Sequence, residues 1–301
     1  MQAPVLFISH GAPTFAVEPG ALGPQLERWG KHLTGLHAVL VISPHWQTNG
    51  IKVMTSPTPE TLHDFGGFPA ALYRLRYDVA GQPPLAMHAG ALLQAAGFEV
   101  EIDDRRGLDH GAWVPLRYLL PEARLPVFQV SMPYDLDPQG AIRIGRELAP
   151  LRDSGVLIVG SGSLTHNLHE FRTGISSESQ YAQEFARWVH ESIVSRDIES
   201  LLAYRTRAPH AQRAHPTEEH FLPLLIALGA SAGTDNIVPI EGGMTYGVLS
   251  MDSYAWGIDQ PPQARVMRNK KLKVAAPARL SENRIADICH TLQFTPPQER
   301  P

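Results

Sequence analysis

Histidines follow three separate apolar runs of this 301-residue sequence, at the point where each run ends. His10 follows the first run by two residues, His45 follows the second by three, and His166 lies a few residues beyond a later one. Short apolar runs of this kind predict buried strands. In an open α/β sheet the loops beyond the carboxyl ends of the strands converge on one crevice. The three imidazoles are therefore expected at one edge of one sheet.

Imidazole binds divalent metals and also transfers protons near neutral pH, so such a cluster indicates a metal centre or an acid–base site. Fourteen histidines against one cysteine favour imidazole over thiolate as the ligand. Each histidine taken alone is also compatible with a capping or surface role in its loop. Gly11 and Pro44, beside His10 and His45, indicate tight turns that would direct a ring inward.

The segment 215–220 offers both imidazole and carboxylate just before a short apolar helix expected over 221–228. His220 would lie in the first turn of this helix, where it can point into the body of the protein. Glu218 and Glu219 also have a plain structural role, because acidic residues near a helix start interact favourably with the helix dipole.

Two loops rich in aromatic, polar and glycine residues are candidates for lining a pocket. The first, at 63–69, contains His63 and Phe65, and the second contains His110 and Trp113. A well-packed structural loop is the alternative for each. A serine hydrolase is disfavoured, since residues 160–164 lack the G-x-S-x-G spacing of a nucleophile elbow.

The elements that must position these residues alternate between strands and helices. Strands are expected over 5–8, 38–42, 51–54, 98–102, 125–130, 156–159 and 248–251, and helices over 85–96, 140–151, 181–202 and 221–228. This alternation predicts an α/β fold, a single domain with a mostly parallel central sheet flanked by helices on both faces. The main domain is expected over residues 1–260, with 261–301 as a basic C-terminal appendage.

Composition excludes several other classes of protein. The chain is 43% hydrophobic and 19% charged, as is usual for a globular protein with a sizeable core. A formal net charge of −4 gives no reason to expect nucleic acid or an anionic membrane as a partner. The single cysteine, Cys289, excludes an internal disulfide framework, and the first residues turn polar too soon for a signal peptide. We therefore expect a cytoplasmic protein.

Six short motifs occur in order between about residues 4 and 256. They are SHGAP at 9–13, SPHW at 43–46, HDFGGFP at 63–69, LDHGAW at 108–113, THNL at 165–168 and PTEEHF at 216–221. Together this set resembles the class III extradiol ring-cleaving dioxygenases, and within them the DOPA 4,5-dioxygenase-like branch. Six separated motifs make the resemblance specific, whereas any one of them alone would be weak.

The resemblance implies a non-haem divalent metal held by His10, His45 and His220, with Fe(II) as the catalytic metal and Zn(II) as another ion that the site would accept. It implies His166 as the general acid–base and His110 as a pocket histidine that hydrogen-bonds substrate or oxygen. In other branches a glutamate replaces one histidine ligand. The glutamates to check in place of His220 are Glu218, Glu219 and Glu241.

The implied reaction is extradiol opening of a catechol, with a small aromatic diol and O2 as substrates. His63, Phe65 and Trp113 would shape the pocket that receives the aromatic ring. One alternative is a zinc-dependent hydrolase or lyase that uses the same three histidines, with His166 as base for a zinc-bound water. Another is a binding module without turnover. The oligomeric state is left open, a homo-oligomer included.

Overall fold

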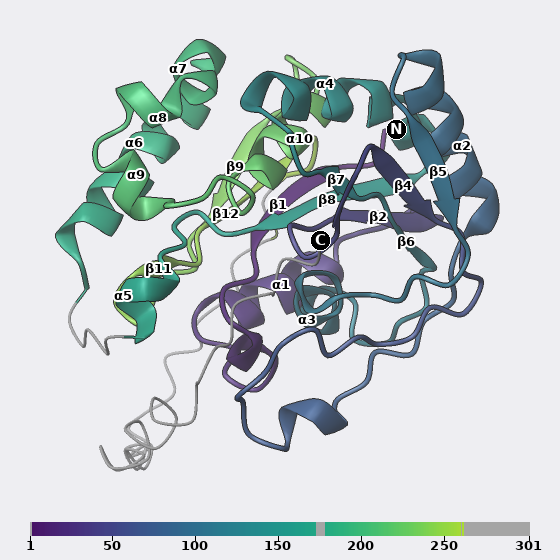
Figure 1. Cartoon of the computed structure of the whole chain (residues 1–301), viewed down its shortest axis with the longest axis horizontal. Helices are drawn as coiled ribbons and strands as arrows, with labels where there is room; N and C mark the ends of the chain where they lie inside the picture. The colour runs from purple at the N-terminus through teal and green to yellow at the C-terminus, as the bar shows by residue number, and fades with distance from the viewer. Residues whose placement is uncertain (1, 173–177, 260, 262–301) are drawn as a thin grey trace, which may run out of the picture.

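A computed structural model describes residues 2–172, 178–259 and 261 of the chain. Its centre is a six-stranded sheet with the order β6-β2-β8-β1-β12-β9, drawn in Figure 1. The strands are β1 (Val5–Ser9), β2 (Ala38–Ile42), β6 (Val127–Gln129), β8 (Val156–Gly162), β9 (Ile237–Ile240) and β12 (Ser253–Trp256).

Four of these strands are parallel, and two antiparallel strands extend the sheet beyond them. β8 pairs in parallel with both β1 and β2, so that Gly162 lies beside Ser9 and Gly160 beside Ile42. β12 then runs antiparallel to β1, and β9 antiparallel to β12. Every residue of β1, β2 and β8 is buried, which explains why these strands read as continuous apolar runs.

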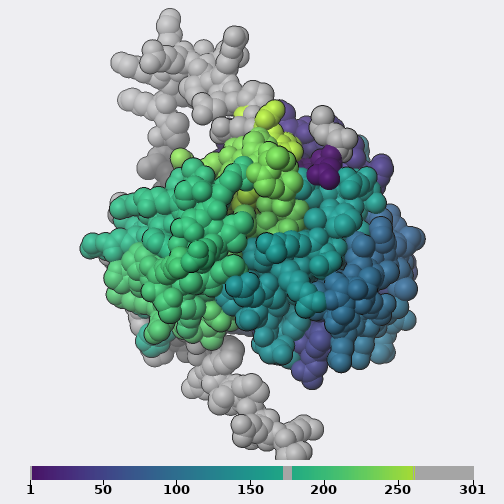
Figure 2. Space-filling model, turned by 90° about the horizontal axis from the view of Figure 1, so that it is seen from above, coloured from purple at the N-terminus to yellow at the C-terminus, as the bar shows by residue number. Residues whose placement is uncertain are grey.

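Helices cover both faces of the sheet, with α4 (Pro138–Leu148) and α10 (Leu222–Ala230) on one face and α1 (Leu22–Gly30) and α3 (His110–Leu119) on the other (Figure 1). Glycine permits the closest approach between α4 and α10. A Cβ at Gly145 would lie 2.0 Å from the carbonyl oxygen of Ile226, so only glycine fits there. Seen from above, α4 lies between the blue segment around α2 and the green helices that follow β8 (Figure 2).

Shorter elements surround this core. Three two-stranded sheets pair β3 (Gln47–Thr48) with β7 (Met132–Pro133), β4 (Ile51–Met54) with β5 (Val100–Asp103), and β10 (Met244–Thr245) with β11 (Leu249–Ser250). The remaining helices are α2 (Pro83–Ala95), α5 (Leu168–Arg172), α6 (Gln180–Val194), α7 (Ile198–Leu202), α8 (Tyr204–Arg207), α9 (Ala211–Ala214) and the 3-10 turns Pro13–Ala16, Leu72–Arg74 and Ala149–Ser154. No helix of the described residues is both long enough and apolar enough to cross a membrane.

The predicted fold class is confirmed: one α/β domain with a mostly parallel central sheet and helices on both faces. The expected strands at 38–42 and 51–54 have the observed bounds, although the second pairs with β5 outside the central sheet. The appendage predicted over 261–301 lies outside the described residues, apart from Pro261. Its boundary at residue 260 therefore stays a prediction.

Three expectations about local structure were wrong. The predicted loop at 109–113 is the start of α3, where the Asp109 side chain accepts a hydrogen bond from the backbone N–H of Ala112 and caps the helix. The predicted helix 181–202 is two helices, α6 and α7, because Arg196 adopts a left-handed backbone (φ 58°) and Asp197 caps a new start. The predicted strand at 248–251 is reduced to Leu249–Ser250 in a hairpin.

Two strands of the central sheet were not predicted. β9 and β12 are the antiparallel pair at its end, and each is only four residues long. Pro239 lies within β9, and a proline in an apolar run lowers its strand signal. β9 is an edge strand, where the missing N–H of proline is tolerated.

Candidate metal centre

Adjacent parallel strands bring the sequence-predicted histidines together, as expected. β1, β8 and β2 are neighbours, and His10, His166 and His45 all lie beyond their carboxyl ends. Gly11 has a left-handed backbone (φ 62°), which turns the chain directly after His10.

A second glycine, Gly111, allows the start of α3 to lie close to this edge of the sheet. A Cβ at Gly111 would lie 2.3 Å from Ser43 Oγ and 2.9 Å from His45 Cδ2. Only a residue without a side chain lets the first turn of α3, which begins with His110, approach His45 so closely.

Five imidazoles form one continuous cluster at this edge. The Nε2 atoms of His10 and His45 lie 3.1 Å apart. The ring of His220 has its centroid 5.5 Å from that of His10 and 5.1 Å from that of His45. The His110 ring lies 3.9 Å from His45, and His166 stacks on His220 at 3.4 Å with an interplanar angle of 10°.

The rings of His10 and His220 each have a hydrogen-bond partner at Nδ1. His10 Nδ1 lies 3.0 Å from Ser161 Oγ, and the Ser161 hydroxyl donates its only hydrogen to the carbonyl of Gly111. The hydroxyl oxygen must therefore accept from His10 Nδ1–H, which leaves the lone pair of that ring on Nε2. His220 Nδ1 is 2.9 Å from Glu219 Oε1, so that its N–H points to the carboxylate in the same way.

Asp64 is the corresponding partner of His110, and it also lies near His45. Its carboxylate lies 3.0 Å from His110 Nδ1 and 3.7 Å from His45 Nδ1. Partners of this kind fix the tautomer and the orientation of histidines that bind metals.

Desolvation favours the uncharged form of four of the five rings, those of His10, His45, His166 and His220. Desolvation is the largest cause that lowers the pKa of His10, His45 and His220 well below the usual value, and the neighbouring imidazoles lower it further. Burial likewise lowers the pKa of His166 to about 3. Neutral imidazoles are the form that binds a cation.

Two groups of donor atoms in the described residues are close enough to hold an ion. One consists of His10, His45 and His110, and the other of His166, Glu219 and His220, with the donor atoms of each group within 4.8 Å of one another. His220 Nε2 is buried and has no hydrogen-bond partner. An unpaired buried nitrogen is costly unless something binds it. The donor set therefore fits a divalent cation bound by histidine nitrogens.

The distance between His10 and His45 also suits a shared ion. Two nitrogens that bind one ion at about 2.1 Å and at angles between 90° and 109° are roughly 3.0–3.4 Å apart. The observed separation of the two Nε2 atoms falls in this range.

The three residues expected to shape the pocket lie in one aromatic cluster beside His110. Phe65 meets the His110 ring edge-on with centroids 5.6 Å apart, and His63 contacts both Phe65 and Trp113. Trp113 is fully buried, and its indole N–H donates to the carbonyl of Leu62. Of the three, Phe65 is the one that contacts a ring of the imidazole cluster, whereas Trp113 holds the loop through its hydrogen bond to Leu62.

The glutamates considered as substitutes for His220 differ in position. Glu219 holds His220 Nδ1, while the Glu218 carboxylate accepts from the Tyr204 hydroxyl and lies 3.6 Å from Arg205. Glu241 lies at a separate cavity described below. His215 is buried, and its Nε2 lies 2.9 Å from the carbonyl of Leu164, outside the imidazole cluster.

Sequence reasoning assigned no role to Asp64, nor to Ser161 as a hydrogen-bond partner. Arg106 donates to the carbonyl of His45 and to Asp109, and its guanidinium lies over the Trp46 ring. Asp64 stood within the HDFGGFP motif, and a carboxylate next to a candidate pocket histidine was the only available signal. The others depend on contacts between distant segments.

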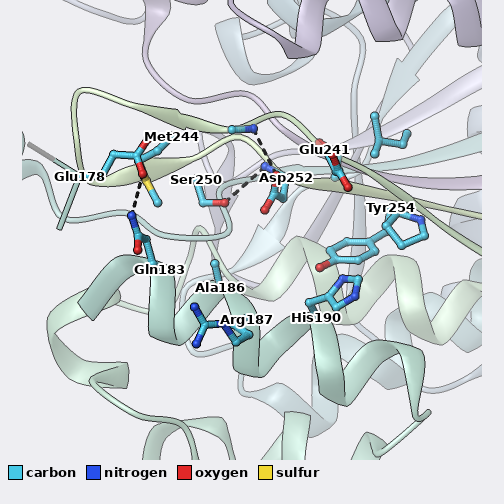
Figure 3. A pocket seen from close by; sticks show the side chains of 14 residues that line it. Glu178, Gln183, Ala186, Arg187, His190, Glu241, Met244, Ser250, Asp252 and Tyr254 are labelled. Atoms are coloured by element: carbon cyan, nitrogen blue, oxygen red, sulfur yellow. Dashed lines mark hydrogen bonds between the residues drawn. The ribbon is translucent and has the colours of Figure 1, made fainter. Parts of the chain in front are cut away.

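A cavity of about 530 Å³ lies beside the antiparallel strands, and none of the five clustered histidines lines it (Figure 3). Helix α6 contributes Arg187 and His190 to one wall, and Glu241, Asp252 and Tyr254 line the other. Ser9 separates this cavity from His10, since its N–H donates to Ser253 Oγ and its hydroxyl donates to the carbonyl of Asp252.

Comparison with known proteins links the fold to a family. The family model of the catalytic LigB subunit of aromatic ring-opening dioxygenase matches residues 5–246. A 4,5-DOPA dioxygenase extradiol from Beta vulgaris is 39% identical over 252 residues, which cover 82% of this chain and 94% of the relative. The Escherichia coli K12 protein of the same name is 36% identical, covering 85% of this chain and 95% of the relative.

A solved structure has the same architecture. The crystal structure of the uncharacterized protein JW3007 from Escherichia coli K12 superimposes with a TM-score of 0.71 at 31% identity. The match covers 84% of this chain and 99% of that one.

Proposed function

Since this chain belongs to the LigB family and is an extradiol ring-cleaving dioxygenase, we propose that it opens a DOPA-like catechol at an Fe(II) ion held by His10, His45 and His220. The observation that carries the proposal is the 3.1 Å separation of the His10 and His45 Nε2 atoms, with the His220 ring 5.5 and 5.1 Å from these two rings and its Nε2 buried and unpaired. Three nitrogen ligands leave positions open on an iron ion, as the chemistry of non-haem oxygenases requires.

The bound iron would supply chelation of both catechol oxygens and electron transfer to O2. The surrounding side chains orient the ligand rings, accept a proton and line the pocket. Ser161 and Glu219 keep the Nδ1 hydrogens of His10 and His220, so that both Nε2 lone pairs stay available. Because desolvation keeps these rings neutral, no proton has to leave before a cation binds.

We assign His166 as the group that takes the proton of a catechol hydroxyl. Its ring lies flat on His220 and is buried, and it makes no hydrogen bond with any of the described residues. Burial, which lowers its pKa to about 3, keeps it unprotonated in the free protein. A catecholate oxygen beside the ring would favour the charged form again, since a nearby negative charge raises the pKa of imidazole.

The aromatic wall beside the cluster suits an aromatic diol. Phe65 and His63 come from the loop that follows β4, and Phe65 packs against His110. An aromatic surface next to hydrogen-bonding imidazoles matches the two halves of a catechol, its ring and its hydroxyls. The names of the relatives favour DOPA as the catechol.

Reconstitution tests the metal and the reaction together. Metal-free protein loaded anaerobically with Fe(II), then given a panel of catechols and O2, should form a yellow ring-fission product, and the same protein loaded with Zn(II) should not. Absence of product with every catechol would contradict the proposal. Product with zinc would contradict the assignment of iron. The compartment that suits ferrous iron is the reducing cytoplasm, which the single cysteine also favours.

A further inference from the structure

One carboxylate, that of Asp64, reaches two imidazoles of the cluster from a distant part of the chain. Asp64 lies 46 residues before His110, in the loop that carries Phe65. Its Oδ1 accepts the backbone N–H of His110 at 2.8 Å, and its Oδ2 lies 3.0 Å from His110 Nδ1. The same Oδ2 is 3.7 Å from His45 Nδ1.

These contacts fix which nitrogen of His110 carries hydrogen. An aspartate carboxyl is ordinarily ionised near neutral pH, and Oδ1 of Asp64 already accepts the backbone N–H of His110. An ionised carboxylate only accepts hydrogen bonds. His110 Nδ1 is therefore the donor, and in the neutral ring Nε2 carries the lone pair.

We propose that Asp64 is a positioning residue that holds His110 in the Nδ1–H tautomer, so that His110 Nε2 accepts a hydrogen bond from a hydroxyl of the bound catechol. The inference rests on the proposed function for the identity of the ligand. The tautomer itself follows from the contacts of Asp64 alone.

The surroundings of His110 place this acceptor where a diol would bind. One of its nitrogens belongs to the donor group with His10 and His45, within 4.8 Å of both. The ring is nearly fully buried, between His45 at 3.9 Å and Phe65 at 5.6 Å. A protonated catechol hydroxyl can donate to this lone pair, whereas an N–H in the same place could bond only to the hydroxyl oxygen, the atom that a cation would also bind.

Asp64 also ties the aromatic wall to the cluster. Phe65 follows it directly, and the bond from the His110 backbone fixes the loop to the first turn of α3. If Asp64 only fixed the loop to α3, it would need only to accept a hydrogen bond from the backbone N–H of His110. A role in the tautomer needs the second, negatively charged oxygen.

The Asp64→Asn variant separates the two roles. Its amide oxygen can still accept the His110 backbone N–H, but its NH2 group cannot accept from Nδ1–H, so the ring should change to the Nε2–H tautomer. Nitrogen-15 NMR of histidine-labelled, zinc-loaded protein reads the tautomer directly, with the His110 signal identified by its loss in His110→Gln. An Nδ1–H tautomer that persists in Asp64→Asn would overturn the proposal.

Kinetics of the iron-loaded enzyme give the second readout. The same exchange beside the catalytic histidine of serine proteases costs about 10⁴-fold, and we expect kcat/KM of Asp64→Asn to fall by about 10²- to 10⁴-fold while the iron content at saturating metal is unchanged. Asp64→Glu, which keeps a carboxylate, should retain the Nδ1–H tautomer and recover at least about tenfold of the loss. An Asp64→Glu variant as inactive as Asp64→Asn, with its tautomer intact, would contradict the link between tautomer and catalysis.

Two controls bracket these variants. Glu219→Gln makes the matching change at His220 and should leave the His110 tautomer as it is. Asp78→Asn removes an exposed carboxylate that pairs with Arg76 on the surface and should change neither tautomer nor activity. If no catechol were cleaved by the unaltered protein, the proposed function would fail, whereas the NMR result would still decide the role of Asp64 on its own.

Discussion

At one edge of the central sheet, the parallel strands and the antiparallel strands are followed or preceded by different kinds of side chain. His10 and His166, which follow β1 and β8, are buried, and His45, which follows β2, is partly buried. Ser161 and Glu219 lie against the Nδ1 atoms of His10 and His220. At the start of β12 and the end of β9 lies an open cavity in which His190 and Arg187 are exposed on α6 (Figure 3).

The contrast separates histidine rings that are suited to bind a metal from rings that are not. Exposed imidazole competes with water for every partner, whereas a desolvated ring with its Nδ1 hydrogen already held has one free lone pair and few alternatives. We therefore do not propose the 530 Å³ cavity as the site of ring cleavage.

Removal of a proposed ligand should have the largest effect. His10→Ala and His220→Ala should each lose bound metal and reduce kcat/KM by about 10³-fold or more, because the ion supplies several kcal/mol of the catalysis. His110→Ala should keep the metal. Metal content after gel filtration and initial rates measure both. A His220→Ala protein that keeps iron while His110→Ala loses it would move the third ligand to His110.

Removal of the proposed proton acceptor should have the next largest effect. His166→Ala should retain its metal and lose about 10²-fold in kcat, within the range that general acid–base catalysis contributes. Metal analysis and anaerobic catechol binding serve as the controls for an intact site. Turnover equal to that of the unaltered enzyme would exclude His166 as the base.

Acid should destabilise the metal-free protein through its neutral buried histidines. Burial lowers the pKa of His215 to about 4 in the folded state, against about 6.5 when unfolded. The unfolded chain therefore binds more protons between these values, so stability falls as the pH falls from 6.5 towards 4, by about 2 kcal/mol at pH 5 for this group alone. Urea unfolding at pH 7.5 and pH 5 measures the loss. His215→Gln should show a smaller pH dependence.

A methyl group at Gly111 should disturb the parallel edge without removing any ligand. Because the added Cβ would press on Ser43 Oγ and His45 Cδ2, Gly111→Ala should weaken metal binding by roughly tenfold, as lost support of a ligand usually does. Gly233→Ala, at a position with no atom within 4 Å of the added Cβ, is the matched control. Competition with a metal-binding dye compares the two affinities.

Changes at the antiparallel edge should have the smallest effect. His190→Ala and Arg187→Ala alter exposed residues of the 530 Å³ cavity, and we expect kcat/KM and metal content to change less than about twofold, the usual size of a surface substitution. A larger rise in KM or a larger fall in kcat would mean that this cavity takes part in substrate binding, and the contrast between the two edges would be lost.

Local patterns were sufficient for the part of the fold that carries the histidines. The apolar runs of β1, β2 and β8 predicted three buried strands, and the histidines after them do lie together. Patterns failed where packing overrides propensity. The start of α3 was not predicted, because Gly111 and Pro115 are poor helix formers. The N-cap role of Asp109 was also not predicted.

The amino-acid sequence by itself determined the fold class, the family and the histidines that gather at one edge, because strand periodicity and short motifs are local properties of the chain. Only the tertiary structure decided which groups hold those rings. Asp64 meets His110 from 46 residues away, and Ser161 joins His10 to Gly111 across three elements. Such contacts depend on strand order and helix packing, which local periodicity does not specify.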